Sequence, residues 1–461
     1  MFIEFVLISH NFLCYDNDED KNGEYFPAGG GICMRKKCLS LCLSAAMLLP
    51  CIAFSACNPG GDPNISETGE VTLRFWNGFT GMDGDSMDAI VADFNEEYAG
   101  EIKVETDKMD WDTLFTKLTT TKSNLSTAPH VVAMSNQRLA GIVDQDLLMA
   151  IDDLPEYLGV TQSDYISSAW NAGVIGGTRY SFPLDIHPTA MFYNKDLISE
   201  EELPSTWEEF VEICVEKTNT ETGVYGFAVP SMYSITKDIF ASILLQNGGA
   251  LFDAENNAVY NSDQGDAALE FLSDLVYTYK VSPENVGAGG DYTLFMAGRS
   301  VFYFDGPWLL NTFDLIKNGD TSHIGVAPMP GATGENGISF SGSHQLTLMK
   351  NTVTSERVKE ACYTFIQYIQ THSLEWAYAG QVPAYLPTLE SEEYQQIEAL
   401  QPFTQTALNA QLGQSDYKYF YEGYNYMGVA VSNAISGKYS AAEALDRAVR
   451  SFSNWIIDNE Y

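Results

Sequence analysis

Two alternating periods of apolar and polar residues organise the chain from residue 70 onward. Val71–Trp76 alternates every second residue, as a half-buried strand does, and a loop rich in Gly and Asp comes next. Ser86–Tyr98 has apolar residues at helical spacing, Ile102–Glu105 again resembles a strand, and Trp111–Thr121 again resembles a helix. With a buried strand at His130–Met134, this order predicts an α/β fold of parallel strands flanked by helices.

A second set of alternating elements begins at Ala190–Asn194. Ser205 and Thr206 precede Glu208 and Glu209 in the pattern of a helix N-terminal cap, and Val301–Phe304 has the pattern of a strand. The last third of the chain is predicted to be rich in helix, with the longest segments at Ser355–Gln370 and Ala441–Trp455.

Length and composition narrow the class of protein. A chain of 461 residues predicts two or three domains, and 45% hydrophobic residues exclude wholesale disorder. The net charge of −38 disfavours nucleic acid and anionic lipid as partners. No apolar run after residue 60 is long enough to span a membrane.

Cysteine placement argues against a metal site and against a disulfide scaffold. Of the 8 cysteines, only Cys214 and Cys362 lie beyond residue 57, and neither belongs to a CxxC motif or a Cys/His cluster. We therefore interpret both as buried free thiols and expect neither a metal nor a cofactor.

The N-terminal region has the pattern of an export signal. Met34–Lys37 is basic, Cys38–Phe54 is mostly apolar, and small residues precede Cys57. This resembles the bacterial lipoprotein signal, in which the cysteine is acylated and becomes the new N-terminus. Phe54 departs from that pattern, which prefers leucine, and an ordinary secretory signal or an uncleaved anchor is the alternative.

We accordingly expect a signal peptide at 34–57 and a flexible, turn-rich tether at 58–69. Residues 1–33 precede a complete signal, and we interpret them as an artefact of the assigned translation start. They contain half of a calcium-loop pattern, but Gly29 stands where that loop needs a glutamate, so calcium binding is not expected.

Several short segments of the chain are similar to motifs of one protein family and occur in the same order as in that family. They are Pro129–Val132, Phe192–Leu197, Thr206–Phe210, Asn247–Phe252, Phe295–Trp308, Gly325–Pro330 and Ser436–Leu445. As an ordered series they resemble the family 1 extracellular solute-binding proteins, which deliver sugars to ABC importers. The resemblance covers nearly the whole chain from residue 70 to 461.

The resemblance implies a type II periplasmic-binding-protein fold, in which two α/β lobes clamp a ligand in the cleft between them. Each lobe would be a mainly parallel sheet flanked by helices. Lobe I is expected at 70–185 and 344–384, and lobe II at 186–343 and 385–461. Crossings between the lobes are expected near 185–188, 341–344 and 383–387.

A sugar site needs aromatic plates for stacking and planar polar groups for paired hydrogen bonds. By resemblance, Trp308 matches a stacking tryptophan of the family's maltose-binding members, presented by the turn at Gly306-Pro307; a core tryptophan is the alternative. Tyr424 falls near a second stacking position, where Tyr421 or Tyr426 are alternatives.

His187 aligns with a ligand-contacting glutamate of the same members, with a structural histidine as the alternative. Met134 and Gln137 replace a tryptophan and an aspartate, so the maltodextrin contacts are not preserved. Position in loops beyond strand ends adds a second group of candidates. These are Trp76, Asn77, Asn136, Arg138, Tyr233, Asp305, Ser343, His344 and Tyr385.

These observations predict a receptor that binds a sugar or oligosaccharide and passes it to the permease subunits of an ABC importer. We expect a monomer at the cell surface that meets the membrane only through its lipid anchor. The motifs GxSxG, HExxH, GxxxxGK[ST] and GxGxxG are absent, so an enzyme is not expected. The alternatives are a same-fold receptor for a peptide, polyamine or metal chelate, a carbohydrate-active enzyme, and a structural adhesin.

Overall fold

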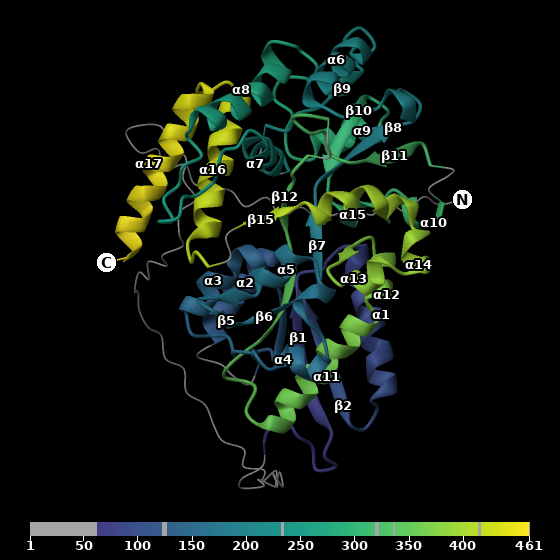
Figure 1. Ribbon diagram of the computed structural model, residues 1–461, viewed down its shortest axis with the longest axis vertical. Coiled ribbons are helices and arrows are strands. Elements are labelled where there is room, and N and C mark those ends of the chain that lie inside the picture. Colours follow the sequence, from purple (N-terminus) through teal and green to yellow (C-terminus); the bar gives the residue numbers. More distant parts are fainter. Residues whose placement is uncertain are drawn as a thin grey trace, which may run out of the picture. The chain divides into compact units, whose positions relative to one another are not determined.

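The computed structural model of the chain describes residues 62–121, 127–231, 235–318, 322–334, 337–413 and 416–460 (Figure 1). The predicted signal peptide, most of the tether and Cys57 lie outside these residues, as does the candidate ligand residue Tyr233.

The first lobe is built on a five-stranded sheet in the order β2-β1-β3-β13-β6. Its strands are β1 (Val71–Asn77), β2 (Ile102–Lys108), β3 (Val131–Ser135), β6 (Ser181–Pro183) and β13 (His344–Leu348). Its main helices are α1 (Met82–Glu97), α2 (Trp111–Thr120), α3 (Asn136–Asp144) and α11 (Glu356–Thr371). The strand and helix pattern predicted for residues 71 to 134 is therefore confirmed.

The second lobe has a four-stranded sheet in the order β11-β8-β10-β9. Its strands are β8 (Ala190–Asn194), β9 (Tyr225–Phe227), β10 (Ser300–Asp305) and β11 (Ile324–Ala327). Its main helices are α6 (Trp207–Lys217), α7 (Thr236–Gln246), α8 (Asp263–Tyr277), α9 (Gly290–Met296), α16 (Phe420–Ile435) and α17 (Ala441–Glu460). Helix α6 begins as predicted, since Thr206 and Glu209 form a reciprocal capping box.

A third small sheet joins the lobes, in the order β14-β7-β12-β15 (Figure 1). Its strands are β7 (Asp185–Pro188), β12 (Phe340–Gly342), β14 (Val382–Pro383) and β15 (Gln411–Leu412). Strands β7 and β12 lie where the first two crossings were expected, and β14 lies at the start of the third.

The prediction that both sheets are mainly parallel is wrong, because both are mixed. In the first lobe β1 runs parallel to β2 and β3, but β13 runs antiparallel to β3 and β6. In the second lobe β8 runs antiparallel to both β10 and β11. The reason is the crossing between lobes: a strand such as β13 that returns from the other lobe enters its sheet from the opposite end.

The boundary expected at residue 385 does not coincide with a break in the core. Leu389 and Phe403 belong to the same apolar cluster as Phe75 of the first lobe, and that cluster also includes Phe192 of the second lobe. Shorter elements complete this region and the rest of the chain. They are α4 (Leu154–Leu158), η2 (Gln162–Asp164), α5 (Ser167–Ala172), β4 (Val174–Ile175), β5 (Thr178–Arg179), η3 (Glu200–Glu202), η4 (Pro307–Leu309), α10 (Leu315–Asn318), α12 (Ser373–Tyr378), α13 (Leu386–Leu389), α14 (Glu392–Gln395), η6 (Glu398–Leu400) and α15 (Gln401–Leu408).

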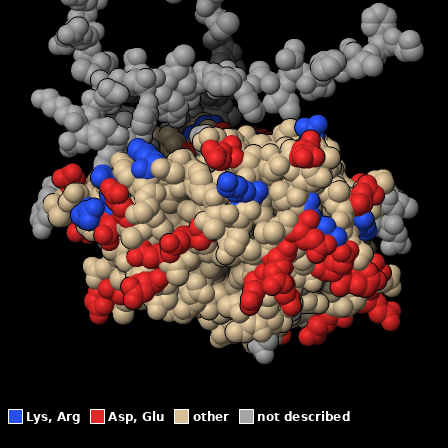
Figure 2. Space-filling model, turned by 90° about the horizontal axis from the view of Figure 1, so that it is seen from above, with Lys and Arg blue, Asp and Glu red and all other residues tan. Residues whose placement is uncertain are grey.

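The burial of the cysteines and the acidic character of the surface agree with the sequence composition. Cys214 and Cys362 are buried free thiols, as predicted. The face drawn in Figure 2 carries more acidic than basic side chains. Within the described residues, none of the helices combines enough length with enough apolar character to cross a bilayer.

Candidate ligand-binding site

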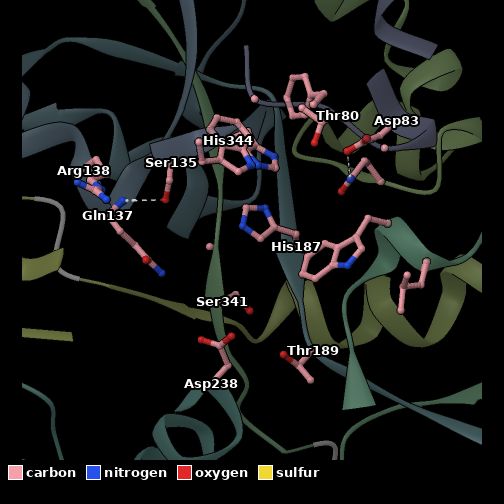
Figure 3. Close-up of a pocket in the computed structure, with 18 of the residues that line it drawn as sticks. Thr80, Asp83, Ser135, Gln137, Arg138, His187, Thr189, Asp238, Ser341 and His344 are labelled. Atoms are coloured by element: carbon pink, nitrogen blue, oxygen red, sulfur yellow. Dashed lines mark hydrogen bonds between the residues drawn. The ribbon is translucent and has the colours of Figure 1, made fainter. Parts of the chain in front are cut away.

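A cavity of about 510 Å³ lies between the two lobes (Figure 3). The first lobe contributes the loop after β1, the start of α2 and the residues after β3. The second lobe contributes the start of α7, the turn η4 and one face of α16, and β7, β12 and the start of β13 form the floor. The volume falls in the range of small-molecule sites, and the loops after β1 and β3 are those expected from the strand pattern.

Aromatic rings from both lobes line this cavity. Trp111 comes from the first lobe, and Trp308, Tyr421 and Tyr424 come from the second. Trp308 is half-buried rather than part of the core. Flat apolar rings on two sides of one cavity suit a ligand that presents apolar faces.

Three of the rings rest directly on glycines. A Cβ atom added to Gly78 would lie 2.2 Å from the Trp111 ring, and one on Gly306 would lie 2.1 Å from the Trp308 ring. One added to Gly342 would lie 2.2 Å from Nε2 of His187. None of these glycines has a positive φ angle, so they are needed for the space they leave and not for their backbone freedom.

A buried carboxylate and two imidazoles form the floor. Nδ1 of His344 lies 2.8 Å from one oxygen of Asp185, and Nδ1 of His187 lies 3.3 Å from the other. The ring of His344 stacks on Trp111 with centroids 5.1 Å apart. Burial raises the pKa of Asp185, but His344 and His187 outweigh it and hold the pKa well below its usual value.

A second carboxylate, Asp238 at the start of α7, lines the second-lobe side of the cavity (Figure 3). It accepts a hydrogen bond from the Tyr424 hydroxyl. Burial raises the pKa of Asp238 to about 7, against the charge of Lys237 and with a further contribution from Asp305. The protonated and ionised forms of Asp238 are therefore both populated close to neutral pH.

Arg138 joins the two lobes at one side of the cavity. Its guanidinium carbon lies 3.3 Å from the centroid of the Tyr421 ring, in the geometry of a cation–π contact, and 4.5 Å from that of Phe115. Asp112 lies 3.5 Å from the same guanidinium group. Gln137 also lines the cavity, next to Ser135, whose hydroxyl caps α3.

On another side, Gln381 lines the cavity and donates from Nε2 to Asp83 over 3.3 Å. Its Oε1 atom is buried and has no hydrogen-bond partner among the described residues. An orphaned buried acceptor at a cavity wall is suited to a ligand that supplies a hydrogen.

The predicted candidates divide between the cavity and its supports. Those that line it are Trp308, Tyr424, His187, Gln137, Arg138 and His344. Trp76 does not, because it is buried under α2 and donates from Nε1 to Asp107. Asp305 accepts from the backbone N–H of Gly306, and so holds the turn that carries Trp308.

The remaining candidates are structural contacts in this conformation. Asn77 is fully buried, and its Oδ1 accepts from the backbone N–H of Phe79. Asn136 accepts from the backbone N–H of Ser343, and the Ser343 hydroxyl donates to the carbonyl of Asp185. Tyr385 packs on Tyr165 outside the cavity.

Sequence reasoning missed most of the walls. The apolar pattern identifies Trp111 only as the first residue of a helix, and Gly78, which leaves room for its ring, lies 33 positions earlier in the chain, so no local signal links the two. Lys237, Asp238 and Gln381 carry no local signal, because only the tertiary fold brings them to the cavity.

Comparison with known proteins places this geometry in a family. Residues 89–407 match the model of the bacterial extracellular solute-binding proteins. The galactooligosaccharide-binding protein of Bacillus subtilis (strain 168) is 24% identical over 374 residues, which is 76% of this chain and 81% of that protein. The arabinooligosaccharide-binding protein of Halalkalibacterium halodurans is 24% identical over 46% of this chain and 48% of its own length.

Solved structures show the same fold. Maltose-bound T. maritima MalE3 superimposes with a TM-score of 0.71 at 21% identity, covering 83% of this chain and 99% of that one. The GacH receptor of Streptomyces glaucescens gives a TM-score of 0.72 at 20% identity, covering 84% and 98%. With a matching family model over most of its length and a two-lobed fold, this chain belongs to the bacterial extracellular solute-binding proteins.

Proposed function

We propose that the chain is the receptor of an ABC importer and binds a neutral oligosaccharide in the cleft between its lobes. The observation that carries the proposal is the placement of Trp111 and Trp308, from opposite lobes, on one cavity of about 510 Å³. Their rings supply apolar plates, and Gln381, His187 and His344 supply polar atoms for hydroxyl groups. The relatives named for galacto- and arabinooligosaccharides support the same class of ligand.

The charge of the lining argues against a polyamine or other strongly charged solute. Asp83, Asp112 and Asp238 are offset by Lys237 and Arg138, and Asp238 is partly protonated near neutral pH. A cation-selective site needs a clear excess of ionised carboxylates. We therefore favour a neutral ligand.

We also propose that the chain binds its ligand without changing it. A glycosidase needs two carboxyl groups free to flank the scissile bond. Here Asp83 accepts from Gln381, and Asp238 accepts from Tyr424. The third carboxylate at the cavity, Asp112, lies 3.5 Å from the guanidinium group of Arg138, so all three are tied to side chains that fit a binding role.

The cellular location of the protein is inferred from the sequence pattern at its N-terminus. We propose that Cys57 is acylated, palmitate being the expected chain, and that residues 58–69 tether the folded unit outside the cell membrane. The protein would act as a monomer and dock on the permease subunits of its importer.

A thermal-shift panel tests the proposed ligand class. The panel contains galactooligosaccharides, arabinooligosaccharides, maltotriose, a polyamine and a peptide mixture. A ligand at one hundred times its Kd adds about 2.7 kcal/mol to the free energy of unfolding, which is a readily measured shift. We expect a shift with at least one neutral oligosaccharide. A shift with the polyamine or peptides alone would contradict the proposal.

A further inference from the structure

The carboxylate of Asp185 is fully buried beneath the cleft floor and accepts hydrogen bonds from several directions. Nε1 of Trp376 donates to it over 2.9 Å, and so does the backbone N–H of His344 over 2.9 Å. The Nδ1 atoms of His344 and His187 complete the set at 2.8 Å and 3.3 Å. The cluster joins β7 to β13, whose residues 185 and 344 are 159 positions apart in the chain.

An ionised carboxylate can only accept hydrogen bonds, so each Nδ1 that contacts Asp185 must carry a hydrogen. In a neutral imidazole the other nitrogen, Nε2, is then a bare acceptor. The two ring nitrogens point in diverging directions, so both Nε2 atoms point away from Asp185. His187 and His344 line the cavity, and the hydrogen bonds that tie their rings to the described part of the chain involve Nδ1.

The neighbouring groups hold these rings in place. Nε2 of His187 lies over Gly342, where no side chain intervenes, and the two imidazole centroids are 4.3 Å apart. His344 is held between Trp111, which stacks on it, and Phe79, which meets it edge-on at 4.9 Å. The orientation of both acceptors is therefore set before any ligand arrives.

We propose that Asp185 is a positioning residue that holds His187 and His344 in the same tautomer, so that their Nε2 atoms form a paired acceptor subsite for the hydroxyl groups of a neutral solute. Gln381 lines the same cavity, and its buried Oε1 has no hydrogen-bond partner among the described residues. A solute carboxylate has no hydrogen to offer such acceptors, so a uronate in place of a neutral sugar ring is rejected. This inference rests on the proposed binding of an oligosaccharide and assigns residues to its selectivity.

The same three side chains are also a donor set that transition metals accept. Two ligands of a tetrahedral zinc ion lie roughly 3.3 Å apart. The 3.3 Å between His187 and Asp185 matches that spacing, but the 2.8 Å between His344 and Asp185 is shorter and is the length of a direct hydrogen bond. The geometry therefore favours positioning over metal binding, and the experiment includes zinc.

The first arm needs no oligosaccharide. Long-range ¹H–¹⁵N correlation spectra of protein labelled at histidine report which ring nitrogen carries the hydrogen. We expect His187 and His344 to be protonated at Nδ1 only, with at least one of them changing tautomer in Asp185→Asn, because an amide can donate to Nδ1. The control is Asp196→Asn, which makes the same change at the partner of His323, a histidine outside the cavity with 79% of its side chain exposed. Protonation at Nε2 in the wild type would overturn the proposal.

The second arm measures binding by calorimetry, using maltotriose or a galactooligosaccharide and a galacturonate oligomer of matched length. We expect the wild type to prefer the neutral ligand, and His187→Leu to lose at least about tenfold in affinity while His187→Gln, which keeps an acceptor, loses less. These variants leave Asp185 in place, so they test the proposal even if Asp185→Asn does not fold. Equal affinity in His187→Leu and wild type would overturn the subsite.

Two further outcomes separate this inference from the proposed function. Stoichiometric Zn²⁺ binding that is lost in His344→Gln would replace the positioning role with a metal site. If the tautomers are as expected but no oligosaccharide binds, the proposed function fails and the hydroxyl subsite with it, while positioning by Asp185 stands.

Discussion

Single residues of the cleft are held in place by the space and charge of their neighbours. Trp308 lies on Gly306, and Asp305 accepts from the backbone N–H of that glycine, so the ring is placed by its own turn. Trp376, by contrast, is fully buried and donates to Asp185. Trp308 is thus expected to contact the ligand and Trp376 to support the fold, and mutation can distinguish the two roles.

Replacing Trp308 by Ala should weaken binding and leave most of the stability. A half-buried ring at a cavity wall leaves little void when it is lost, so we expect the unliganded variant to melt within a few degrees of wild type. The ligand affinity should fall by on the order of 1–3 kcal/mol, the energy of burying an aromatic plate. Trp376→Ala is the matched control, with an expected cost of about 3–5 kcal/mol in stability. Early melting of Trp308→Ala with unchanged affinity would make Trp308 a core residue.

Asp238 predicts a dependence of stability on pH. Its pKa in the folded protein is raised to about 7, above its unfolded value, so the folded state binds the proton more tightly. The folded state therefore loses stability as pH rises from about 4 to 7, by an expected 1–2 kcal/mol after allowance for partial exposure. Asp238→Asn keeps an acceptor for Tyr424 and should remove this loss. Denaturant titrations of both proteins at pH 5 and pH 8 measure the difference, and parallel pH profiles would contradict it.

At the scale of elements, the cleft depends on the residues at the strand ends. β1 ends at Asn77, and Gly78 then leaves the space that the Trp111 ring of α2 occupies. β12 ends at Gly342, which leaves space for His187 of β7. The strand ends thus accept rings from neighbouring elements, which brings separate parts of the chain to one cavity.

Gly78→Ala should therefore disturb the site indirectly, by displacing the ring of Trp111. The added methyl group falls 2.2 Å from Trp111, so the ring must move and the first aromatic plate is displaced. We expect a stability cost of about 1–3 kcal/mol and a clear loss of oligosaccharide affinity. Gly287→Ala is the control, because a Cβ there meets nothing within 4 Å. Equal behaviour of the two variants in a thermal-shift assay with ligand would refute this role of Gly78.

For the whole molecule, the interlobe sheet makes hinge motion the expected response to ligand. The strands β7 and β12 are short, and the cavity has walls from both lobes, so a ligand that touches both walls stabilises the state in which they are close. Small-angle scattering should show a smaller radius of gyration at saturation with ligand. A radius unchanged by a ligand that calorimetry shows to be bound would indicate a rigid site.

The anchor makes a second prediction at this scale. If Cys57 is acylated, wild-type protein should sediment with membranes and Cys57→Ser should be released. Each buried CH₂ of an acyl chain contributes about 0.8 kcal/mol, so the difference should be large. Cys214→Ser, which changes a buried thiol, is the control for loss of a cysteine elsewhere. Equal release of the wild type and Cys57→Ser would exclude the lipid anchor.

Local patterns in the sequence determined the secondary-structure elements of this protein, and the order of its motifs indicated its family. Period and capping located β1, α1, α6 and α11 to within a few residues, because these signals depend on neighbours a few positions apart. The ordered motifs indicated two lobes and pointed to Trp308. They could not indicate that β13 runs antiparallel in its sheet, since strand direction depends on which lobe the chain returns from.

Only the tertiary structure decided which polar residues face the ligand and which support them. Asn77, Asn136 and Ser343 have residue types and loop positions that fit a sugar site, yet Oδ1 of both asparagines and the Ser343 hydroxyl make hydrogen bonds within the fold. Asp185 has no local motif, and it meets His344 across 159 residues of sequence. Sequence pattern reports on nearby positions, whereas a cleft between lobes is made of contacts between distant ones, and burial decides which of its polar atoms remain available.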